Sequence, residues 1–387
     1  MSSVKQFSSN SKIIIMTVLT ILLIVVTFYI VTAVIQNWQI NEIIENQEEN
    51  APIHNPIIKP LLKSDIRNPQ TTEILLECGK DTHCVLENIQ TLAKIENQEM
   101  VLSIVNEIIT VWGKGDFYCH DIAHHLGQFL LGYFKGDLLE ALSHANNNCG
   151  NALYHGIVEN YLPSKVMFEN AKIRDLDITT TCMELGSSNN SYVGLNCVHG
   201  MGHSLAKVYN YDVFEAVKRC DEFQTVDEQE GCHDGLFMEN AVEYSKRSGG
   251  NFDENDIFYP CNKLDEKYQK KCYIYQGSII LLENNYFPEE SFIQCEKIDS
   301  EELIKSCYNG ASRYMALLYF YSIESTATMC KQVNPTYQKV CILATVGTVT
   351  LYVDQELGDD YCKLFPEEQS EYCIKEWNTI QEYHNLA

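Results

Sequence analysis

The chain has little positive charge. Only 28 of its 387 residues are Lys or Arg, against 53 Asp or Glu, so its formal net charge is −25. No cluster of basic residues is left over to neutralise phosphate groups. Nucleic acid and anionic lipid headgroups are therefore poor partners, and we expect no nucleic-acid binding.

Several short motifs of enzyme families are also missing. The sequence has no GxxxxGK(S/T) phosphate loop, no GxGxxG dinucleotide turn, no GxSxG nucleophile elbow and no CxxCH haem attachment. Its sixteen cysteines include no CxxC knuckle, which argues against a zinc site built from thiolates. No substrate or reaction class is indicated by any of these familiar motifs.

One long apolar run lies near the N-terminus. Residues 13–35 carry no charge and are rich in Ile, Val and Leu, which is enough helix to cross the roughly 30 Å hydrocarbon layer of a bilayer. Lys5 and Lys12 precede the run, whereas the charges just after it are all negative, so the positive-inside bias keeps the N-terminus in the cytoplasm. The sequence thus predicts a cytoplasmic tail at 1–12, a transmembrane signal-anchor helix at 13–35 and an extracytoplasmic main domain.

A cleaved signal peptide is the competing interpretation, because residues 31–33 (Val-Thr-Ala) would serve as a weak cleavage site. The run exceeds the roughly 7–15 apolar residues of a signal peptide, which favours the anchor. Residues 36–70 are polar and contain several prolines, so we expect a stalk there.

All sixteen cysteines follow the apolar run. In an extracytoplasmic domain, a large and even number of cysteines indicates disulfides. From residue 182 onward they form six pairs: Cys182/Cys197, Cys220/Cys232, Cys261/Cys272, Cys295/Cys307, Cys330/Cys341 and Cys362/Cys373. The second members recur at steps of 35, 40, 35, 34 and 32 residues, a period typical of stacked helical hairpins.

We interpret the first cysteine of each pair as the end of a short amphipathic helix and the second as the start of a longer apolar helix. Eleven residues of continuous helix would separate the two Cα atoms by about 16 Å, whereas a disulfide needs roughly 4.4–6.8 Å. The chain must therefore turn between two bonded neighbours. Bonds between neighbouring repeats are the alternative. For the four earlier cysteines we expect Cys78/Cys84 and Cys119/Cys149.

The expected fold is all-α, a solenoid-like array of disulfide-bridged helical hairpin repeats that follows one transmembrane helix. Within it we place a His-rich helical region at 71–240. Cys-paired helical repeats follow at 241–387, where the cysteines continue but the histidines and acids at corresponding places do not.

Eight of the eleven histidines lie between His120 and His233. Three pairs of residues in this part are spaced i to i+4, so that each pair projects from one face of a helix: His120/His124, His155/Glu159 and His199/His203. Imidazole and carboxylate suit zinc, iron or copper, and cysteines locked in disulfides leave histidines and acids as the available ligands. The sequence therefore predicts a transition-metal site with these six residues as ligands.

Four further residues are second-rank ligand candidates: Asp121, His233, Asp234 and Glu239. If the site is catalytic, Glu159 or Glu239 is the expected general acid or base beside a metal-bound water. His125 and His144 are expected to be ordinary packed histidines. Two glycines between His199 and His203 weaken a helix by roughly 2 kcal/mol relative to alanine. They would also let two backbones pack closely.

His120, Asp121 and His124 resemble the short His-Asp signature of the HD-type metal-dependent phosphohydrolases. The resemblance implies a metal-activated water that cleaves a phosphoester, with His120 and Asp121 as ligands. It covers five residues, and that family also needs a histidine on an earlier helix, where only His54 and His83 are present.

A different class of function remains open. A helical-repeat scaffold binds a protein partner along its concave face, and the histidines would then be merely packed. Bound metal is the measurement that separates this alternative from the metal site.

Overall fold

The computed structural model describes residues 68–79, 81–112, 118–146, 148–186, 191–246, 249–318, 322–350 and 357–386. Apart from one isolated β-bridge between Asp253 and Asp256, the regular elements of these residues are helices, so the predicted all-α class is confirmed. The longer helices are α2 (Pro69–Cys78), α3 (Thr82–Leu92), α4 (Gln98–Trp112), α5 (Tyr118–Tyr133), α6 (Leu138–Ser143), α7 (Ala152–Glu159), α8 (Tyr161–Glu169), α9 (Thr179–Gly186), α10 (Ser191–Val208), α11 (Val213–Cys220), α12 (Val226–Ser245), α13 (Glu266–Glu283), α14 (Pro288–Cys295), α15 (Glu301–Leu318), α16 (Ile323–Gln332), α17 (Gln338–Thr348), α18 (Leu357–Cys362) and α19 (Glu367–Leu386). Short 3-10 helices lie at Asn148–Asn151, Ile173–Asp175, Cys261–Lys263 and Pro335–Tyr337.

The predicted tail at 1–12, the transmembrane segment at 13–35 and the stalk up to residue 67 lie outside the described residues. The last part of the predicted stalk is helical, because α2 begins at Pro69 after the Asn68 side chain caps it. None of the helices in the described part combines the length and the apolar character needed to cross a bilayer.

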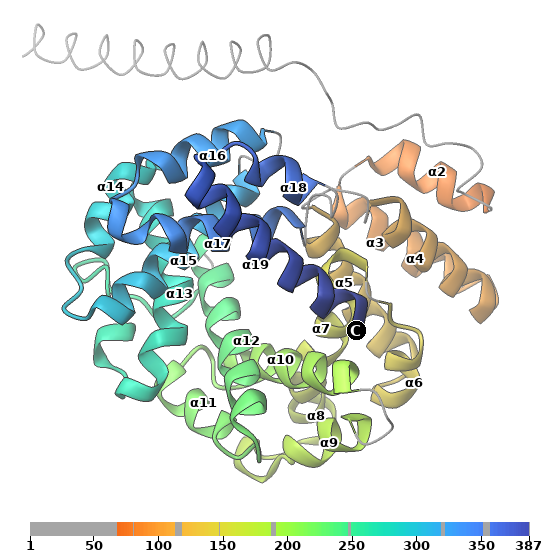
Figure 1. Cartoon of the computed structure of the whole chain (residues 1–387). Coiled ribbons are helices and arrows are strands. Elements are labelled where there is room, and N and C mark those ends of the chain that lie inside the picture. The colour runs from red at the N-terminus through yellow and green to blue at the C-terminus, as the bar shows by residue number, and fades with distance from the viewer. Residues whose placement is uncertain are drawn as a thin grey trace, which may run out of the picture. The chain divides into compact units, whose positions relative to one another are not determined.

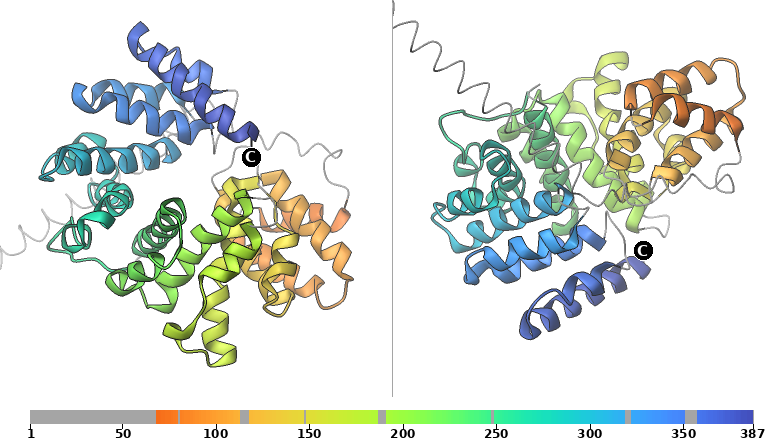
Figure 2. Two further views of the ribbon diagram at one scale, coloured as in Figure 1. Left: turned by 60° about the horizontal axis from the view of Figure 1, so that its bottom comes forward. Right: turned by 90° about the horizontal axis from the view of Figure 1, so that it is seen from above.

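The larger helices pack in chain order (Figures 1 and 2). Helix α5 packs on α7, α7 on α10, α10 on α12, α12 on α13, α13 on α15, α15 on α17, and α17 on α19. Shorter helices flank these: α9 packs on α10, α11 on α12, α14 on α15, α16 on α17, and α18 on α19. Each short helix therefore precedes and contacts a longer one, as the cysteine spacing predicts.

All sixteen cysteines lie in eight disulfides, and the predicted pairing is confirmed for every one. Their Cα atoms are 5.3 to 5.7 Å apart, so the chain turns between the two members of each pair. Cys220, for example, ends α11, and its partner Cys232 lies in the second turn of α12. From Cys182 onward, each such bond fixes a short helix to the long helix that follows it. The Cys78–Cys84 bond joins α2 to α3, and the Cys119–Cys149 bond joins α5 to the 3-10 helix at Asn148–Asn151.

Local sequence determines where these helices start. Asp212 caps α11 by accepting from the backbone N–H groups of Phe214 and Glu215. Thr225 and Glu228 form a reciprocal capping box at the start of α12. Such a cap contributes about 1 kcal/mol, because it satisfies N–H groups that have no partner within the helix. Helix α12 is therefore fixed at its N-terminus by both a cap and a disulfide.

The core is one continuous cluster of buried apolar side chains that extends from α2 to α19 and includes most of the cysteines. Among its largest fully buried members are Ile108, Leu126, Ile157, Phe237 and Tyr308. Among the described residues, the buried polar side chains occur along the whole array, and eight of the eighteen lie on α7, α10 and α12: His155, Glu159, Asn196, His203, Ser204, His233, Glu239 and Asn240.

Candidate metal centre

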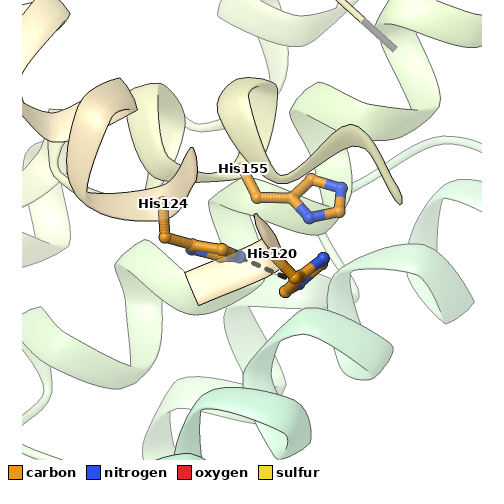
Figure 3. A group of neighbouring side chains, drawn as sticks. All are labelled: His120, His124 and His155. Atoms are coloured by element: carbon orange, nitrogen blue, oxygen red, sulfur yellow. Dashed lines mark hydrogen bonds between the residues drawn. The ribbon is translucent and has the colours of Figure 1, made fainter. Parts of the chain in front are cut away.

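Five of the predicted histidines come together. His120 and His124 lie on α5, His155 on α7, and His199 and His203 on α10. Neighbouring rings have centroids 4.5 to 6.1 Å apart, so the imidazoles form one continuous cluster. Figure 3 shows the first three of these rings turned toward one another across α5 and α7.

Helix α10 runs through His199, two glycines and His203 without a break, so both histidines project from one face. The glycines serve close packing, as proposed from the sequence. A Cβ atom on Gly202 would collide with the carbonyl oxygen of Cys232, and one on Gly235 would collide with that of His199. Gly156 makes the same kind of approach to His124 across the α5–α7 contact. These close helix crossings bring polar side chains of different helices within hydrogen-bonding distance of one another.

The first histidine pair lies on α5. His120 Nδ1 donates to the carbonyl oxygen of Cys149 at 2.8 Å, and His124 Nδ1 donates to Glu159 Oε2 at 2.6 Å. Both acceptors lack protons, so each ring carries its proton on Nδ1 and keeps a lone pair on Nε2. The two Nε2 atoms lie 3.2 Å apart. Two lone pairs thus face each other at the distance of a hydrogen bond.

The second pair, on α10, has nearly the same arrangement. His203 Nδ1 donates to Glu239 Oε2 at 2.9 Å, and His199 Nδ1 lies 3.7 Å from Asp234 Oδ2. The Nε2 atoms of the two rings are 3.1 Å apart. His203 is 1% exposed and Glu239 is 5% exposed, so water does not relieve this contact.

His155 lies between the two pairs. Its Nε2 donates to the side-chain oxygen of Asn196 at 3.0 Å, which leaves the lone pair on Nδ1. That Nδ1 atom is buried and has no hydrogen-bond partner. A buried polar atom without a partner costs on the order of 1–3 kcal/mol, so it marks a place where a ligand or ion would be stabilising.

A local distortion of the backbone holds the His120 acceptor in place. Cys149, Gly150 and Asn151 have φ angles of 57°, 62° and 64°, three left-handed residues in succession. Left-handed backbone costs a non-glycine residue on the order of 1–3 kcal/mol. The Cys119–Cys149 disulfide fixes this turn beside His120, and the carbonyl oxygen of Cys149 points at the ring.

The two glutamates are linked by a lysine. Lys207 Nζ forms an ion pair with Glu159 Oε1 and lies 3.7 Å from Glu239 Oε1. The other oxygen of each carboxylate accepts from a histidine, His124 for Glu159 and His203 for Glu239. Burial by itself raises the pKa of Glu159, but the hydrogen bond from His124 and the nearby positive charges outweigh it and lower that pKa. Burial likewise opposes the charge of Lys207, yet the two glutamates raise the pKa of its ammonium group.

Burial keeps three of the donor histidines neutral: His120, His155 and His199. Burial and the charge of His124 lower the pKa of His120 to about 3. Burial and the charge of His203 lower the pKa of His199 to about 3. Burial lowers the pKa of His155 well below its ordinary value, and the four neighbouring imidazoles add to the shift. These lone pairs are therefore free of protons at neutral pH, which metal binding requires.

The ligand atoms fall into three groups of mutual distance below 4.8 Å: His120, His124 and His155; His155, His199 and His203; and Glu159, His203 and Glu239. The third group is the poorest fit to a cation. Its carboxylate oxygens already accept from His124, His203 and Lys207, and the ammonium group of Lys207 would repel an ion there.

The four second-rank ligand candidates lie in different places relative to the histidine cluster. Glu239 joins the centre, and Asp234 lies behind His199 and 3.5 Å from Lys271. His233 faces away from the cluster, with its Nε2 3.6 Å from Asp221. Asp121 is exposed and belongs to none of the three ligand groups, so the geometry gives no support to the HD-type resemblance.

The two histidines expected to be packed differ from the donors. His144 stacks on Phe134 and lies 3.4 Å from Glu140. Neither His144 nor His125 belongs to a ligand group. His83, the earlier histidine that the HD-type resemblance would need, has an 84% exposed side chain that pairs with Glu87.

Two residues of the centre were missed by the sequence reasoning. Lys207 follows His203 by four residues on α10, so continuing the i to i+4 spacing by one step would have found it. Asn196 carried no comparable signal, because a single asparagine beside Cys197 is unremarkable in sequence. Its role depends on how α7 packs on α10.

The chain was compared with known proteins in three ways. No protein-family model, no curated protein and no solved structure matches it. The chemistry of the centre is therefore argued from its own geometry.

Proposed function

We propose that this protein binds a transition-metal ion through imidazole nitrogens of His120, His124, His155, His199 and His203. One observation carries the proposal. In the His120/His124 pair, both Nδ1 atoms donate to acceptors, so the two Nε2 lone pairs face each other across 3.2 Å. In the His199/His203 pair, His203 Nδ1 donates to Glu239, His199 Nδ1 lies 3.7 Å from Asp234, and the two Nε2 atoms are 3.1 Å apart. A cation between the two Nε2 atoms of a pair replaces this contact with two coordinate bonds.

The separation of the nitrogens suits such an ion. Two nitrogens that each lie about 2.0–2.1 Å from a tetrahedral zinc ion are about 3.3–3.4 Å apart. The observed Nε2 to Nε2 distances of 3.2 and 3.1 Å are within a few tenths of an ångström of that value. Neutral imidazole suits zinc, copper and iron, and the donor set is compatible with any of the three.

Glu159 and Glu239 are assigned a supporting role. A metal-bound histidine usually donates its other ring N–H to a carboxylate or carbonyl, which fixes the ring and makes its ligand nitrogen more basic. Glu159 does this for His124 and Glu239 for His203. We therefore assign Glu159, which the sequence suggested as a ligand, to orienting His124. Either glutamate remains a candidate proton carrier if the centre is catalytic.

We further propose that the centre is extracytoplasmic and tethered by a helix at 13–35. The eight disulfides support an oxidising surrounding, because cytosolic thiols are kept reduced. We interpret the succession of disulfide-linked helix pairs as hairpin repeats. A membrane-impermeant protease added to intact cells should digest the main domain, and protection of that domain would contradict the orientation.

The scaffold alternative leaves the centre unexplained. A protein-binding surface has no need of ten ring nitrogens in a buried cluster, nor of two carboxylates bridged by a lysine. Burying such groups without a function costs stability, because each must be desolvated and paired.

Elemental analysis tests the proposal. The full chain is purified without reducing agent, stripped with a chelator, reloaded with Zn²⁺ and freed of excess metal. We expect at least one ion per chain in the parent protein and reduced occupancy when His199 and His203 are changed to alanine. His144→Ala is the matched control, because His144 is a partly buried histidine outside the ligand groups. A parent protein without metal, or occupancy unaffected by the double change, would contradict the proposal.

A further inference from the structure

We propose that the centre holds two metal ions, one at each histidine pair, and that His155 supplies a third histidine ligand to only one of them. This inference rests on the proposed metal binding and specifies its stoichiometry. It gives the centre one ion with three histidine ligands and one ion with two.

A single ion cannot reach both histidine pairs at once. Two nitrogens on opposite sides of one ion are at most about 4.2 Å apart, twice the metal–nitrogen distance of about 2.1 Å. In the described part of the chain, no group of mutually close donors joins one whole histidine pair to a member of the other. The two groups of three histidines share only His155. One ion would therefore have to abandon ligands of one pair to bind the other.

The two histidine pairs also have matching surroundings. Each pair has its two Nε2 atoms at nearly the same separation, and each has its own carboxylate behind the second histidine. Glu159 on α7 serves His124, and Glu239 on α12 serves His203. Each half of the centre thus contains the lone pairs and the hydrogen-bonded carboxylate that a bound ion needs.

His155 makes the two halves unequal. Its ring offers one lone pair, because Nε2 donates to Asn196 and Nδ1 alone is unpartnered. A single lone pair adds a third histidine to one ion, and the other ion then has two protein ligands. Open positions on an ion are what catalytic and exchange sites have and structural sites lack. A four-coordinate ion with three histidines keeps one open position and an ion with two histidines keeps two, so the two-histidine ion is the more open to water or a small substrate.

The charge behind the histidines makes double occupancy reasonable. Glu159, Glu239 and Asp234 contribute three carboxylates, and each lies within 4 Å of a donor histidine. Lys207 beside the two glutamates and Lys271 beside Asp234 offset part of this charge. Two dications are thus partly neutralised by carboxylates that belong to the centre, and no carboxylate has to leave its histidine.

Stoichiometry tests the inference. The full chain, stripped of metal, is titrated with Zn²⁺, and bound ions per chain are counted. We expect two in the parent, one after His120→Gln with His124→Gln, one after His199→Gln with His203→Gln, and two in the His144→Gln control. One ion in the parent that both double variants abolish would overturn the inference and leave the proposed metal binding standing. No ion in the parent would overturn both.

A spectroscopic measurement on the parent protein needs no variant, so it stays decisive if a double variant does not fold. Two Cu²⁺ ions held in adjoining histidine groups interact magnetically, which broadens or removes the paramagnetic resonance signal of an isolated Cu²⁺. We expect an isolated signal at the first equivalent that changes to an interacting one as the second binds. Isolated signals throughout, with saturation at one equivalent, would overturn the two-ion centre.

Discussion

The α10–α12 helix pair and the α13–α15 helix pair share a framework but differ in chemistry. In both, each long helix is bonded to a preceding segment through a cysteine near its start: Cys197, Cys232, Cys272 and Cys307. Both pairs cross at glycines in the same places relative to those cysteines. A Cβ atom on Gly202 or Gly277 would collide with the carbonyl oxygen of the partner helix's cysteine.

The side chains at corresponding places differ. Counted from the cysteines, the positions of His199, His203, Lys207 and Glu239 in the first pair hold, in the second pair, Ile274, Ser278, Leu282 and Tyr314. These four polar side chains of the centre are therefore replaced while the close crossing is kept. The backbone framework thus does not require the metal chemistry.

The largest expected loss of stability follows from disturbing the close helix crossing that both pairs share. Gly235→Ala and Gly310→Ala each place a methyl group against a carbonyl oxygen of the facing helix, of His199 and Ile274 respectively. Because both contacts are backbone, we expect each change to destabilise the fold by about 3 kcal/mol or more. Chemical denaturation measures it. Gly132→Ala is the control, since its methyl group meets nothing within 4 Å, and we expect no loss of stability. If either Gly235→Ala or Gly310→Ala left the stability unchanged, the claim that both helix pairs depend on a close backbone crossing would be wrong.

The second-largest expected effect is a loss of stability that should differ between the α10–α12 pair and the α13–α15 pair. Lys207→Met leaves Glu159 and Glu239, both buried, without their common cation. Breaking a fully buried ion pair costs about 3–5 kcal/mol, but Lys207 keeps 27% of its side chain exposed, so we expect about 2 kcal/mol. The corresponding Leu282→Met should cost less than about 1 kcal/mol, because the two side chains have similar volumes. Equal losses of unfolding free energy in Lys207→Met and Leu282→Met would contradict this difference between the two helix pairs.

A third prediction concerns the metal alone. Glu239→Gln removes the negative charge behind His203 while keeping an oxygen near Nδ1. Loss of such a supporting carboxylate weakens metal binding about 10- to 100-fold, which competition with a calibrated chelator would detect. Tyr314→Phe, at the corresponding position of the other pair, should leave the affinity unchanged. An unaltered affinity in Glu239→Gln would show that the carboxylate does not support the ligand.

The smallest predicted effect is on the acid stability of the metal-free protein. Unfolded histidines bind a proton near pH 6.5, whereas the pKa values of folded His120 and His199 are about 3. Between these values the unfolded state binds more protons, so stability is complete above pH 6.5 and falls as the pH drops toward 3. For these two histidines together we expect a loss on the order of 1–2 kcal/mol at pH 6. A His199→Gln variant should lose less, and an equal loss would mean that other groups cause it.

Much of the framework could be predicted because its signals are local. Cysteine spacing indicated the six disulfides from Cys182 onward, since bonded neighbours at this spacing require a turn between two helices. The two earlier pairs were expected without such a repeated pattern and are also found. The i to i+4 spacing of His120/His124 and His199/His203 correctly placed each pair on one helix face. The predicted stalk extended to about residue 70, whereas α2 begins at Pro69, because a proline also opens helices.

The sequence by itself indicated the helices, the favoured disulfide partners and the residue types that can hold a metal, because these follow from spacing along one chain. Only the tertiary structure decided which nitrogen of each ring carries the proton. That choice depends on acceptors from other segments: the Cys149 carbonyl for His120, Glu159 for His124 and Asn196 for His155. It also decided that the glutamates face histidines and Lys207, because the crossing of helices distant in sequence sets those distances.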